Sequence, residues 1–373
     1  MPARTVPPFR ADHVGSFLRP AKLHEARRQR AAGALSAGEL RAVEDEAVRE
    51  VVALQREAGL RSVTDGEFRR STWHMDFIYQ IGGISKAPGS LVSTFHGDQG
   101  DITFTPDAIA VTRKLSMDST IFGADFAFLR SVAGDAVPKQ TIPAPSMVHY
   151  RSGVRAVVAE SVYPDVEEFW ADLGAAYNDE VLRLAAQGCR YLQLDDTSLA
   201  YVNDPAQREY LAARGEDAEH MHERYIALTN AAVAGRPADM AVTTHLCRGN
   251  FRSSWVASGG YDFVAESLFN GLDVDGFFLE YDDERSGGFE PLRFVPRGKQ
   301  VVLGLVTTKR PELERKDDLK RRVEQAAKYV PLDQICLSGQ CGFASTEAGN
   351  ALTADEQKAK LELIVATAGE IWG

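Results

Sequence analysis

Apolar positions at helical spacing alternate along the chain with short, nearly continuous apolar runs. Helical periodicity predicts seven helices, over residues 36–58, 164–187, 206–213, 217–234, 260–270, 311–328 and 355–371. The apolar runs predict eight strands, at 9–16, 61–67, 139–145, 189–195, 240–247, 276–281, 301–306 and 334–339. Runs such as VVLGLV at 301–306 are typical of strands buried on both faces of a parallel sheet. This order predicts an α/β fold, a (β/α)8 TIM barrel that uses residues 1–373 as one catalytic domain.

One segment, at about 86–135, does not follow this alternation. Its sequence STFHGDQGDITFTPDAIAVTR has the glycine and aspartate turns of a β-hairpin, so we expect an excursion between the second and third strands. No GxGxxG motif follows the first predicted strand, which disfavours an open dinucleotide-binding sheet.

Charge and composition narrow the classes of partner. The 53 acidic residues outnumber the 42 basic ones, and the net charge of −11 disfavours nucleic acid and anionic membranes. No apolar run approaches the eighteen residues of a membrane span, and residues 1–16 do not resemble a secretory signal. We therefore expect a cytoplasmic protein acting on small molecules, with its four cysteines reduced and free for metal or catalysis. These patterns do not predict an oligomeric state.

Polar side chains gather where the predicted strands end. In a barrel the active site lies at the carboxyl ends of the strands. Six predicted strands end in such residues, which are His13 and Ser16, Asp65 and Glu67, Asp195 and Asp196, His245 and Cys247, Glu280, and Cys341. Six polar strand ends at one mouth predict a functional site there.

The spacing of His245 and Cys247 indicates a metal site. Residues two apart on a strand lie on the same face, and an imidazole with a thiolate suits tetrahedral Zn²⁺. Cys341 and Glu280 are the candidates for the remaining ligands, and a displaceable carboxylate would make the site catalytic. The alternative is a buried core pair, with Cys341 packed as a small apolar side chain.

The acids Glu67, Asp195 and Asp196 could bind a second metal, act as acid and base, or hold an ammonium group. Solvated loop acids are the alternative, although Asp195 ends an apolar strand. The segment 68–74, which contains Trp73, could cover the site or bind an anionic group, or it could form outward salt bridges.

Several longer motifs carry a family resemblance. These are HVGSFLRP, TDGEFRRSTWHMDF, YLQLDDTSLAY, THLCRGNFRSSW, FFLEYDDERSGGFEPL, LGLVTTKRPELE and LSGQCGFASTEAGN. Together they resemble the short, single-barrel relatives of cobalamin-independent methionine synthase. The resemblance implies zinc held by His245, Cys247, Glu280 and Cys341, and a thiol such as homocysteine held by Ser16, Glu67 and Asp195. It implies a zinc-dependent S-methyltransferase of methionine biosynthesis, in which a zinc-activated thiolate attacks a methyl donor.

Two departures concern the methyl donor. By eye alignment, His149 stands where the full-length enzymes have a tryptophan that stacks on the pterin. Lys309 stands where the family has a histidine thought to protonate the leaving group. Neither position touches the predicted zinc or thiol sites.

Two other functions remain open. The fold and the HxC…C pattern are also similar to those of epoxyalkane:coenzyme M transferases, in which Arg19, Arg69 or Arg70 could bind the sulfonate. A non-catalytic zinc storage or regulatory protein is the third hypothesis. The acids Glu67 and Asp195 favour an amino thiol over coenzyme M, because they suit an ammonium group.

Overall fold

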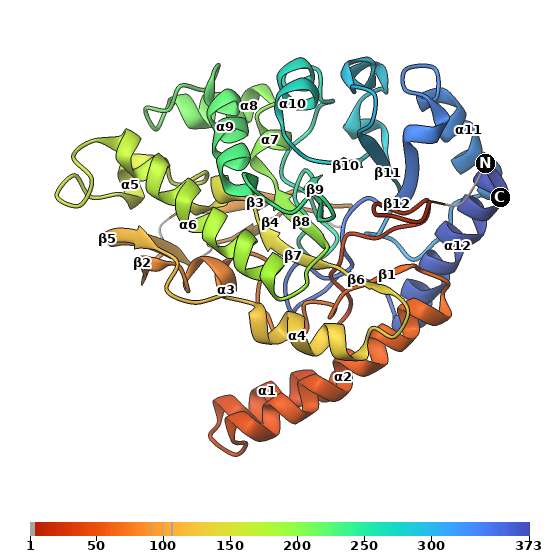
Figure 1. Ribbon diagram of the computed structural model, residues 1–373, viewed down its shortest axis with the longest axis horizontal. Coiled ribbons are helices and arrows are strands. Elements are labelled where there is room, and N and C mark those ends of the chain that lie inside the picture. Colours follow the sequence, from red (N-terminus) through yellow and green to blue (C-terminus); the bar gives the residue numbers. More distant parts are fainter. Residues whose placement is uncertain (1–3, 90, 99, 106) are drawn as a thin grey trace.

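A six-stranded parallel sheet forms the centre of the molecule in the computed structural model, which describes residues 4–89, 91–98, 100–105 and 107–373 (Figure 1). Its strands pair in chain order and are β7 (Gln140–Pro143), β8 (Tyr191–Asp196), β9 (Ala241–Leu246), β10 (Gly276–Glu280), β11 (Gln300–Val306) and β12 (Ile335–Gly339). Each lies within a segment predicted as a strand or within one residue of it, so six of the eight predicted strands are confirmed. Their carboxyl ends all lie on the same side of the sheet, because neighbours run in parallel.

The other two predicted strands are much shorter than expected. Strand β1 (Ser62–Val63) pairs in parallel with β6 (Val137–Pro138), and the segment 9–16 makes only two isolated parallel bridges, Ala11 with Leu337 and Ser16 with Gly66. The predicted strand at 9–16 is therefore wrong as a regular strand.

Local chemistry explains why these two segments leave the ladder. The Asp12 carboxylate accepts the backbone N–H groups of Phe9 (3.0 Å) and His13 (2.8 Å), which a regular strand would offer to a neighbour. Farther along, Gly66 and Glu67 have φ of 69° and 60°, so the chain turns directly after β1. A positive φ is costly for a residue with a side chain, and at Glu67 it fixes the direction of a buried carboxylate.

Helices surround the sheet. The seven predicted helices are confirmed with shifted ends, as α2 (Ala37–Glu57), α6 (Val166–Ala186), α8 (Pro205–Ala212), α9 (Met221–Val233), α10 (Ala265–Gly271), α11 (Lys316–Ala326) and α12 (Ala354–Trp372). Helix α2 starts in a capping box, in which the N–H of Glu39 donates to Ser36 Oγ (3.2 Å) and the N–H of Ser36 donates to Glu39 Oε2 (2.8 Å).

Nine short or weakly apolar elements were not predicted. They are α1 (Ala21–Ala31), α3 (Met75–Ile78), α4 (Gly123–Val132), α5 (Val154–Val157), α7 (Ser198–Tyr201), η1 (Pro145–Val148), η2 (Glu284–Ser286), η3 (Glu290–Phe294) and η4 (Leu332–Gln334). Helix α1 buries only Leu23 and Ala26, so it has no apolar periodicity to reveal it.

The segment between β1 and β6 contains two antiparallel pairs. Strand β2 (Gly82–Ala87) pairs with β5 (Ala108–Ser116), and β3 (Ser93–Phe95) pairs with β4 (Ile102–Phe104). The irregular segment therefore begins at β2, slightly before the predicted start at residue 86.

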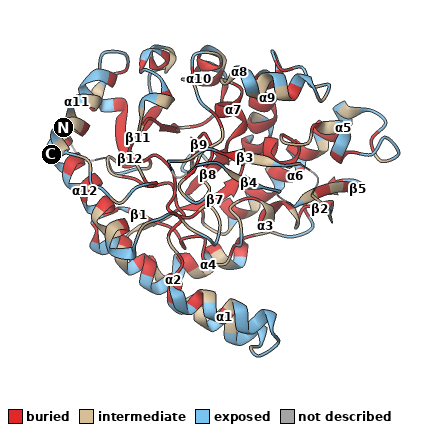
Figure 2. Cartoon of the chain, turned by 180° about the vertical axis from the view of Figure 1, so that it is seen from behind, coloured by how far each residue is buried: buried red, intermediate tan, exposed pale blue. Residues whose placement is uncertain are grey.

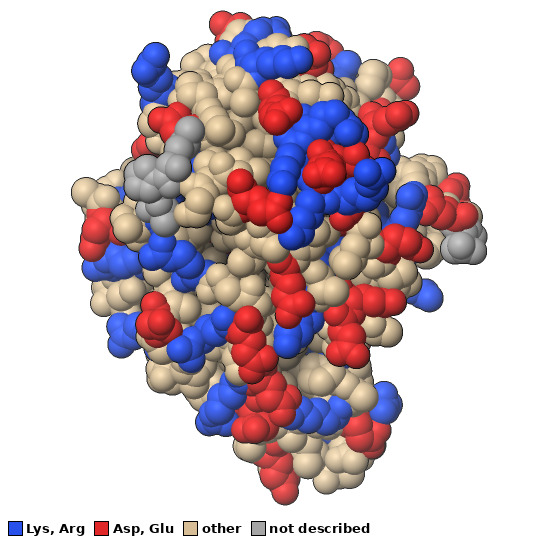
Figure 3. Space-filling model, turned by 90° about the vertical axis from the view of Figure 1, so that its right-hand side faces the viewer, with Lys and Arg blue, Asp and Glu red and all other residues tan. Residues whose placement is uncertain are grey.

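The core lies between the sheet and the surrounding helices, whose outer surfaces are exposed (Figure 2). Lys139, which directly precedes β7, is buried. Its Nζ donates to the carbonyl of His13 (2.6 Å) and lies 3.5 Å from an Asp12 carboxylate oxygen. Acidic and basic side chains are interspersed on the face shown in Figure 3. Among the described residues, no helix has both the length and the apolar character needed to span a membrane.

Candidate active site

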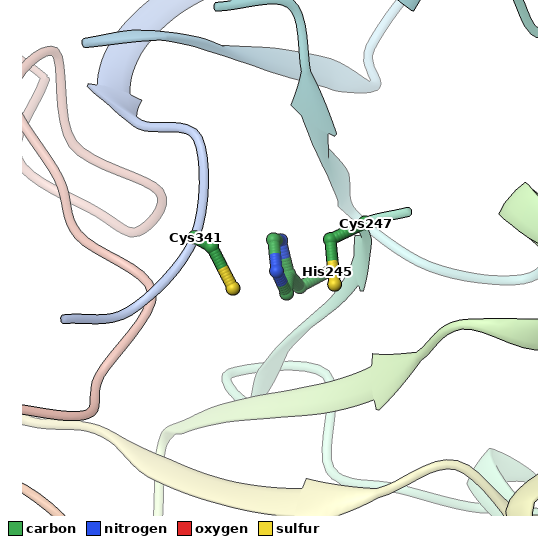
Figure 4. A group of neighbouring side chains, drawn as sticks. All are labelled: His245, Cys247 and Cys341. Atoms are coloured by element: carbon green, nitrogen blue, oxygen red, sulfur yellow. The ribbon is translucent and has the colours of Figure 1, made fainter. Parts of the chain in front are cut away.

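Three of the four predicted metal ligands meet at the carboxyl ends of β9 and β12. His245 lies in β9, Cys247 directly follows it, and Cys341 comes from the loop after β12 (Figure 4). One potential ligand atom from each lies within 4.8 Å of the other two, and all three side chains are buried. Both ring nitrogens of His245 lack a hydrogen-bond partner among the described residues. Because buried polar atoms are normally paired, an unpaired ring nitrogen of His245 together with the sulfurs of Cys247 and Cys341 forms a possible metal site.

The two thiols are not equivalent. A hydrogen bond from Cys247 lowers the pKa of Cys341 well below its usual value, and His245 adds to that effect. The same contact with Cys341, together with burial, raises the pKa of Cys247. Burial opposes a charge on His245, but contact with the Cys341 sulfur raises the pKa of that imidazole. The site therefore holds one thiolate readily, and a cation would favour the second.

The fourth predicted ligand, Glu280, lies outside this group of three. It is the last residue of β10, and its side chain is fully buried. Its Oε1 accepts from Arg285 (2.8 Å) and Lys309 (3.1 Å), and its Oε2 accepts from the backbone N–H of Arg248 (2.6 Å). The prediction that Lys309 does not touch the predicted zinc ligands is therefore wrong. Burial alone would raise the pKa of Glu280, but Lys309 and Arg285 outweigh it and hold that pKa below its usual value.

A cavity of about 420 Å³ opens onto the three potential ligands. It is lined by five of the other predicted residues, which are Ser16, Glu67, Trp73, Asp195 and Asp196. Asp196 is saturated, because it accepts from the N–H and hydroxyl of Ser198 and from the Ser146 hydroxyl. Of the three acids predicted to bind a ligand, Glu67 and Asp195 therefore have the most capacity left; Asp76 and Asp107 also line the cavity.

Glu67 and Asp195 are buried carboxylates that repel each other. Burial and the charge of Glu67 raise the pKa of Asp195 to about 7. Burial also raises the pKa of Glu67, against the opposing effects of Arg70 and Arg19. Glu67 Oε1 accepts from the Thr141 hydroxyl (2.9 Å), whereas its Oε2 has no partner among the described residues. Two such acids with a spare lone pair suit a cationic ligand.

Several predicted site residues do not line this cavity; they are His13, Arg19, Asp65, His149 and Lys309. Arg19 donates to the backbone carbonyls of Glu67 (3.0 Å), Arg70 (3.2 Å) and Ala344, so it braces the loops that carry the site. Asp65 accepts the backbone N–H of Glu67 (2.9 Å) and helps to fix its left-handed conformation. The other two arginines considered for a sulfonate, Arg69 and Arg70, also lie outside the cavity.

His149 is buried beside the site rather than in it. Its ring packs against Trp170 at 4.6 Å between centroids, and its Nε2 lies 3.3 Å from the Tyr225 hydroxyl. Burial lowers the pKa of His149 to about 3, so the ring is neutral. His13 is likewise neutral, because burial lowers its pKa to about 4, and its Nε2 lies 3.2 Å from the carbonyl of Ser62.

Four residues that the sequence did not single out belong to the site: Arg151, Tyr201, Asn250 and Arg285. The first three line the cavity. The guanidinium of Arg151 has no hydrogen bond or ion pair within the described part of the chain, and neither Tyr201 Oη nor Asn250 Oδ1 has a partner there. All but Arg151 fall inside the motifs quoted for the resemblance, which is the one signal that could have found them.

Comparison with known proteins identifies the family. The sequence pattern described as cobalamin-independent synthase, catalytic domain, matches residues 9–370. The chain is 48% identical over 366 residues to Bacillus subtilis YxjH, covering 98% of this chain and 95% of that protein. It is 22% identical over 335 residues to the methionine synthase of Pyrococcus abyssi, covering 88% and 85% of the two chains.

A solved structure shares the fold over the full length. It is the putative vitamin-B12-independent methionine synthase from Listeria monocytogenes, at 37% identity and a TM-score of 0.78, covering 99% of this chain and 100% of that one. The match to the family pattern spans every element of the site, from the segment before Ser16 to the loop that carries Cys341. The chain belongs to the cobalamin-independent synthase catalytic-domain family.

Proposed function

We propose that this protein is a zinc-dependent thiol alkyltransferase that methylates homocysteine or a closely similar amino thiol. The observation that carries the proposal is the single cavity that joins the His245, Cys247 and Cys341 group to the buried acids Glu67 and Asp195. A thiol end and an ammonium end are the two features of homocysteine that such a cavity can recognise. Membership of the family, and the relatives named methionine synthase, support the same reaction.

The donor atoms fit zinc, with Glu280 as the further ligand that the family resemblance implies. One imidazole nitrogen without a partner and two thiols form an N/S set that Zn²⁺ prefers. A zinc ion bound there would supply the deprotonation of a coordinating thiol at neutral pH, which turns a poor nucleophile into a good one.

The protein's own residues bind and orient the amino thiol. The ammonium group is placed between Glu67 and Asp195, where it relieves the repulsion that raises the pKa of Asp195. Ser16 Oγ already accepts the backbone N–H of Ala344 (3.3 Å), so its hydroxyl proton is free to donate to the substrate carboxylate. With the ammonium and carboxylate groups of the substrate held in this way, its sulfur is directed toward Cys247 and Cys341.

A closed (β/α)8 barrel accounts for this convergence, and we infer that residues 1–373 form one such domain. In support, Ala11 bridges to β12, Ser16 bridges to the turn after β1, and β1 pairs with β6, so that the segments follow one another around a ring. In a ring, Ser16 and Glu67 come to lie beside Cys341, although they stand at opposite ends of the sequence.

A specific observation favours a second candidate, the opening of an epoxide by coenzyme M. Arg151 lines the cavity and its guanidinium has no partner in the described residues, so it could bind a sulfonate. Arg19, Arg69 and Arg70, the cations first considered for that role, do not line the cavity.

A crossed thiol-consumption assay on the zinc-loaded protein tests both candidates. Homocysteine and coenzyme M are each combined with methyl-folate, methylcobalamin and a small epoxide, and the thioether product is identified by mass spectrometry. We expect consumption of homocysteine with a methyl donor. Consumption of coenzyme M with the epoxide, and none of homocysteine, would overturn the proposal. Stoichiometric zinc binding without consumption of either thiol would instead favour a storage or regulatory protein.

A further inference from the structure

The Glu280 carboxylate is paired with two cations and one backbone N–H group. Arg285 and Lys309 lie at 2.8 Å and 3.1 Å from its Oε1, and the backbone N–H of Arg248 lies at 2.6 Å from its Oε2. Arg248 directly follows Cys247, so the carboxylate lies next to the group of three without belonging to it. Glu280 is thus beside the possible metal site and already paired.

The two cations are held in place independently of Glu280. Lys309 also lies 3.2 Å from Asp282, and Arg285 lies 3.1 Å from Asp283 and 4.7 Å from the centre of the Trp255 ring. The side chain of Lys309 is almost fully buried. A charged pair in such surroundings is expensive to separate, because each partner would be left unpaired.

Lys309 does not line the substrate cavity. A substrate confined to that cavity would not contact Lys309, which is therefore not placed to protonate a leaving group there. Its contacts are two carboxylates, and its effect on the reaction can only pass through them. The structure therefore gives Lys309 the place of a positioning residue.

We propose that Lys309 and Arg285 form a holding site for the Glu280 carboxylate. Held there, Glu280 stays away from His245, Cys247 and Cys341 and leaves a coordination position open for the substrate thiol. A zinc ion held by those three residues would compete with Lys309 and Arg285 for this carboxylate, and the two cations would set how easily the substrate thiol enters. This inference rests on the proposed function and goes beyond it by assigning a role to Lys309 and Arg285.

Neutralising one cation should move the competition toward the metal. In Lys309→Met, Glu280 keeps one cation, Arg285, and the backbone N–H of Arg248, and becomes more available as a fourth ligand. We expect zinc to bind more tightly than to the native protein by about tenfold, the scale on which groups behind metal ligands act. The KM for homocysteine should rise, while kcat changes less, because the thiol must now displace a ligand. Lys309→Arg keeps the charge and should restore native behaviour.

Zinc affinity is measured alone, by competition with a chromophoric chelator, so the test does not depend on turnover. The matched control is Lys299→Met, which removes a partly buried lysine just before β11, at the opposite end of that strand from Lys309; its Nζ donates to the carbonyls of Phe269 (3.3 Å) and Leu272. It should leave zinc affinity unchanged. In a Glu280→Gln background, Lys309→Met should no longer tighten zinc binding, because the competing carboxylate is gone.

Two results would overturn the inference. One is an unchanged or weaker zinc affinity in Lys309→Met, and the other is a tightening that persists in the Glu280→Gln background. If Lys309→Met does not fold, Arg285→Met carries the same test with the same expected direction. A native protein that binds no zinc would overturn the proposed function as well, whereas native zinc binding with no effect of the substitution overturns this inference alone.

Discussion

Replacing Glu67 by glutamine isolates the proposed ammonium site. Glutamine keeps the shape of the side chain and can still accept from the Thr141 hydroxyl, but it has no negative charge. Removing one partner of a buried, hydrogen-bonded charge pair costs about 2–5 kcal/mol. Asp195 remains to hold the ammonium, so we expect the lower part of that range, about 2–3 kcal/mol. At 1.36 kcal/mol per factor of ten, kcat/KM for homocysteine should fall about 30- to 150-fold.

The assay pairs the substitution with a change in the substrate. Homocysteine and 4-mercaptobutyrate differ only in the amino group, so the loss in Glu67→Gln should appear with the first thiol and be nearly absent with the second. Glu180→Gln is the matched control, since Glu180 is another buried glutamate, on α6 and outside the cavity. An equal loss with both thiols would refute the reasoning, because Glu67 would then act on the fold or on the sulfur and not on the ammonium.

Three further substitutions test the metal site, the donor site and the electrostatics of the fold. Cys341→Ser should lower zinc affinity and thiol consumption together, by about a hundredfold or more. The control Cys336→Ser, at a buried thiol inside β12, should change neither quantity. Metal analysis and the thiol assay measure both, and turnover that survives the loss of zinc would contradict the mechanism. His149→Phe should leave the KM of the methyl donor unchanged, because His149 does not line the cavity. It should lower the free energy of unfolding by about 1 kcal/mol, because the contact with Tyr225 is lost. A large rise in the KM of the methyl donor would instead place His149 in the donor site. Burial raises the pKa of Glu180 to about 7, so the folded state binds its proton more tightly than the unfolded state and the free energy of unfolding should fall as pH rises from about 4.5 to about 7. Chemical denaturation across that range should show the slope in the native protein and a smaller slope in Glu180→Gln; equal slopes would mean that Glu180 is not the group responsible.

The central strands could be predicted because they are buried on both faces and therefore consist of consecutive, mostly apolar residues. Strand β11 is buried at every position, and a run of apolar residues is the signature of that environment. The segment 9–16 has fewer apolar residues than β11, and a single carboxylate, Asp12, takes two of its backbone donors. Hydropathy does not reveal a hydrogen bond of this kind. The prediction therefore gave a regular strand where the structure has only isolated bridges at Ala11 and Ser16.

The group of three potential ligands was also predictable, because it depends on strand register alone. His245 and Cys247 share a face by their spacing, and Cys341 follows another strand of the same parallel sheet. The place of Glu280 depends instead on long side chains that reach across loops. Arg285 lies inside a quoted motif, but its contact with Glu280 appears only in three dimensions, since nothing in the local sequence indicates which carboxylate it pairs with.

The sign of the charge in the cavity favours an amino thiol over a sulfonated one. Glu67 and Asp195 repel each other, and Cys341 is readily anionic, so the cavity gathers buried negative charge. Buried like charges weaken the fold unless a ligand of opposite sign enters, and the interaction is strong because little water screens it. An ammonium group between the acids and a metal cation at the sulfurs would neutralise both regions at once. A sulfonate would add a further anion to the same 420 Å³, where Lys86 and Arg151 are the lining lysine and arginine. The charge balance of the pocket, more than its shape, therefore supports the proposal that the substrate is an amino thiol such as homocysteine.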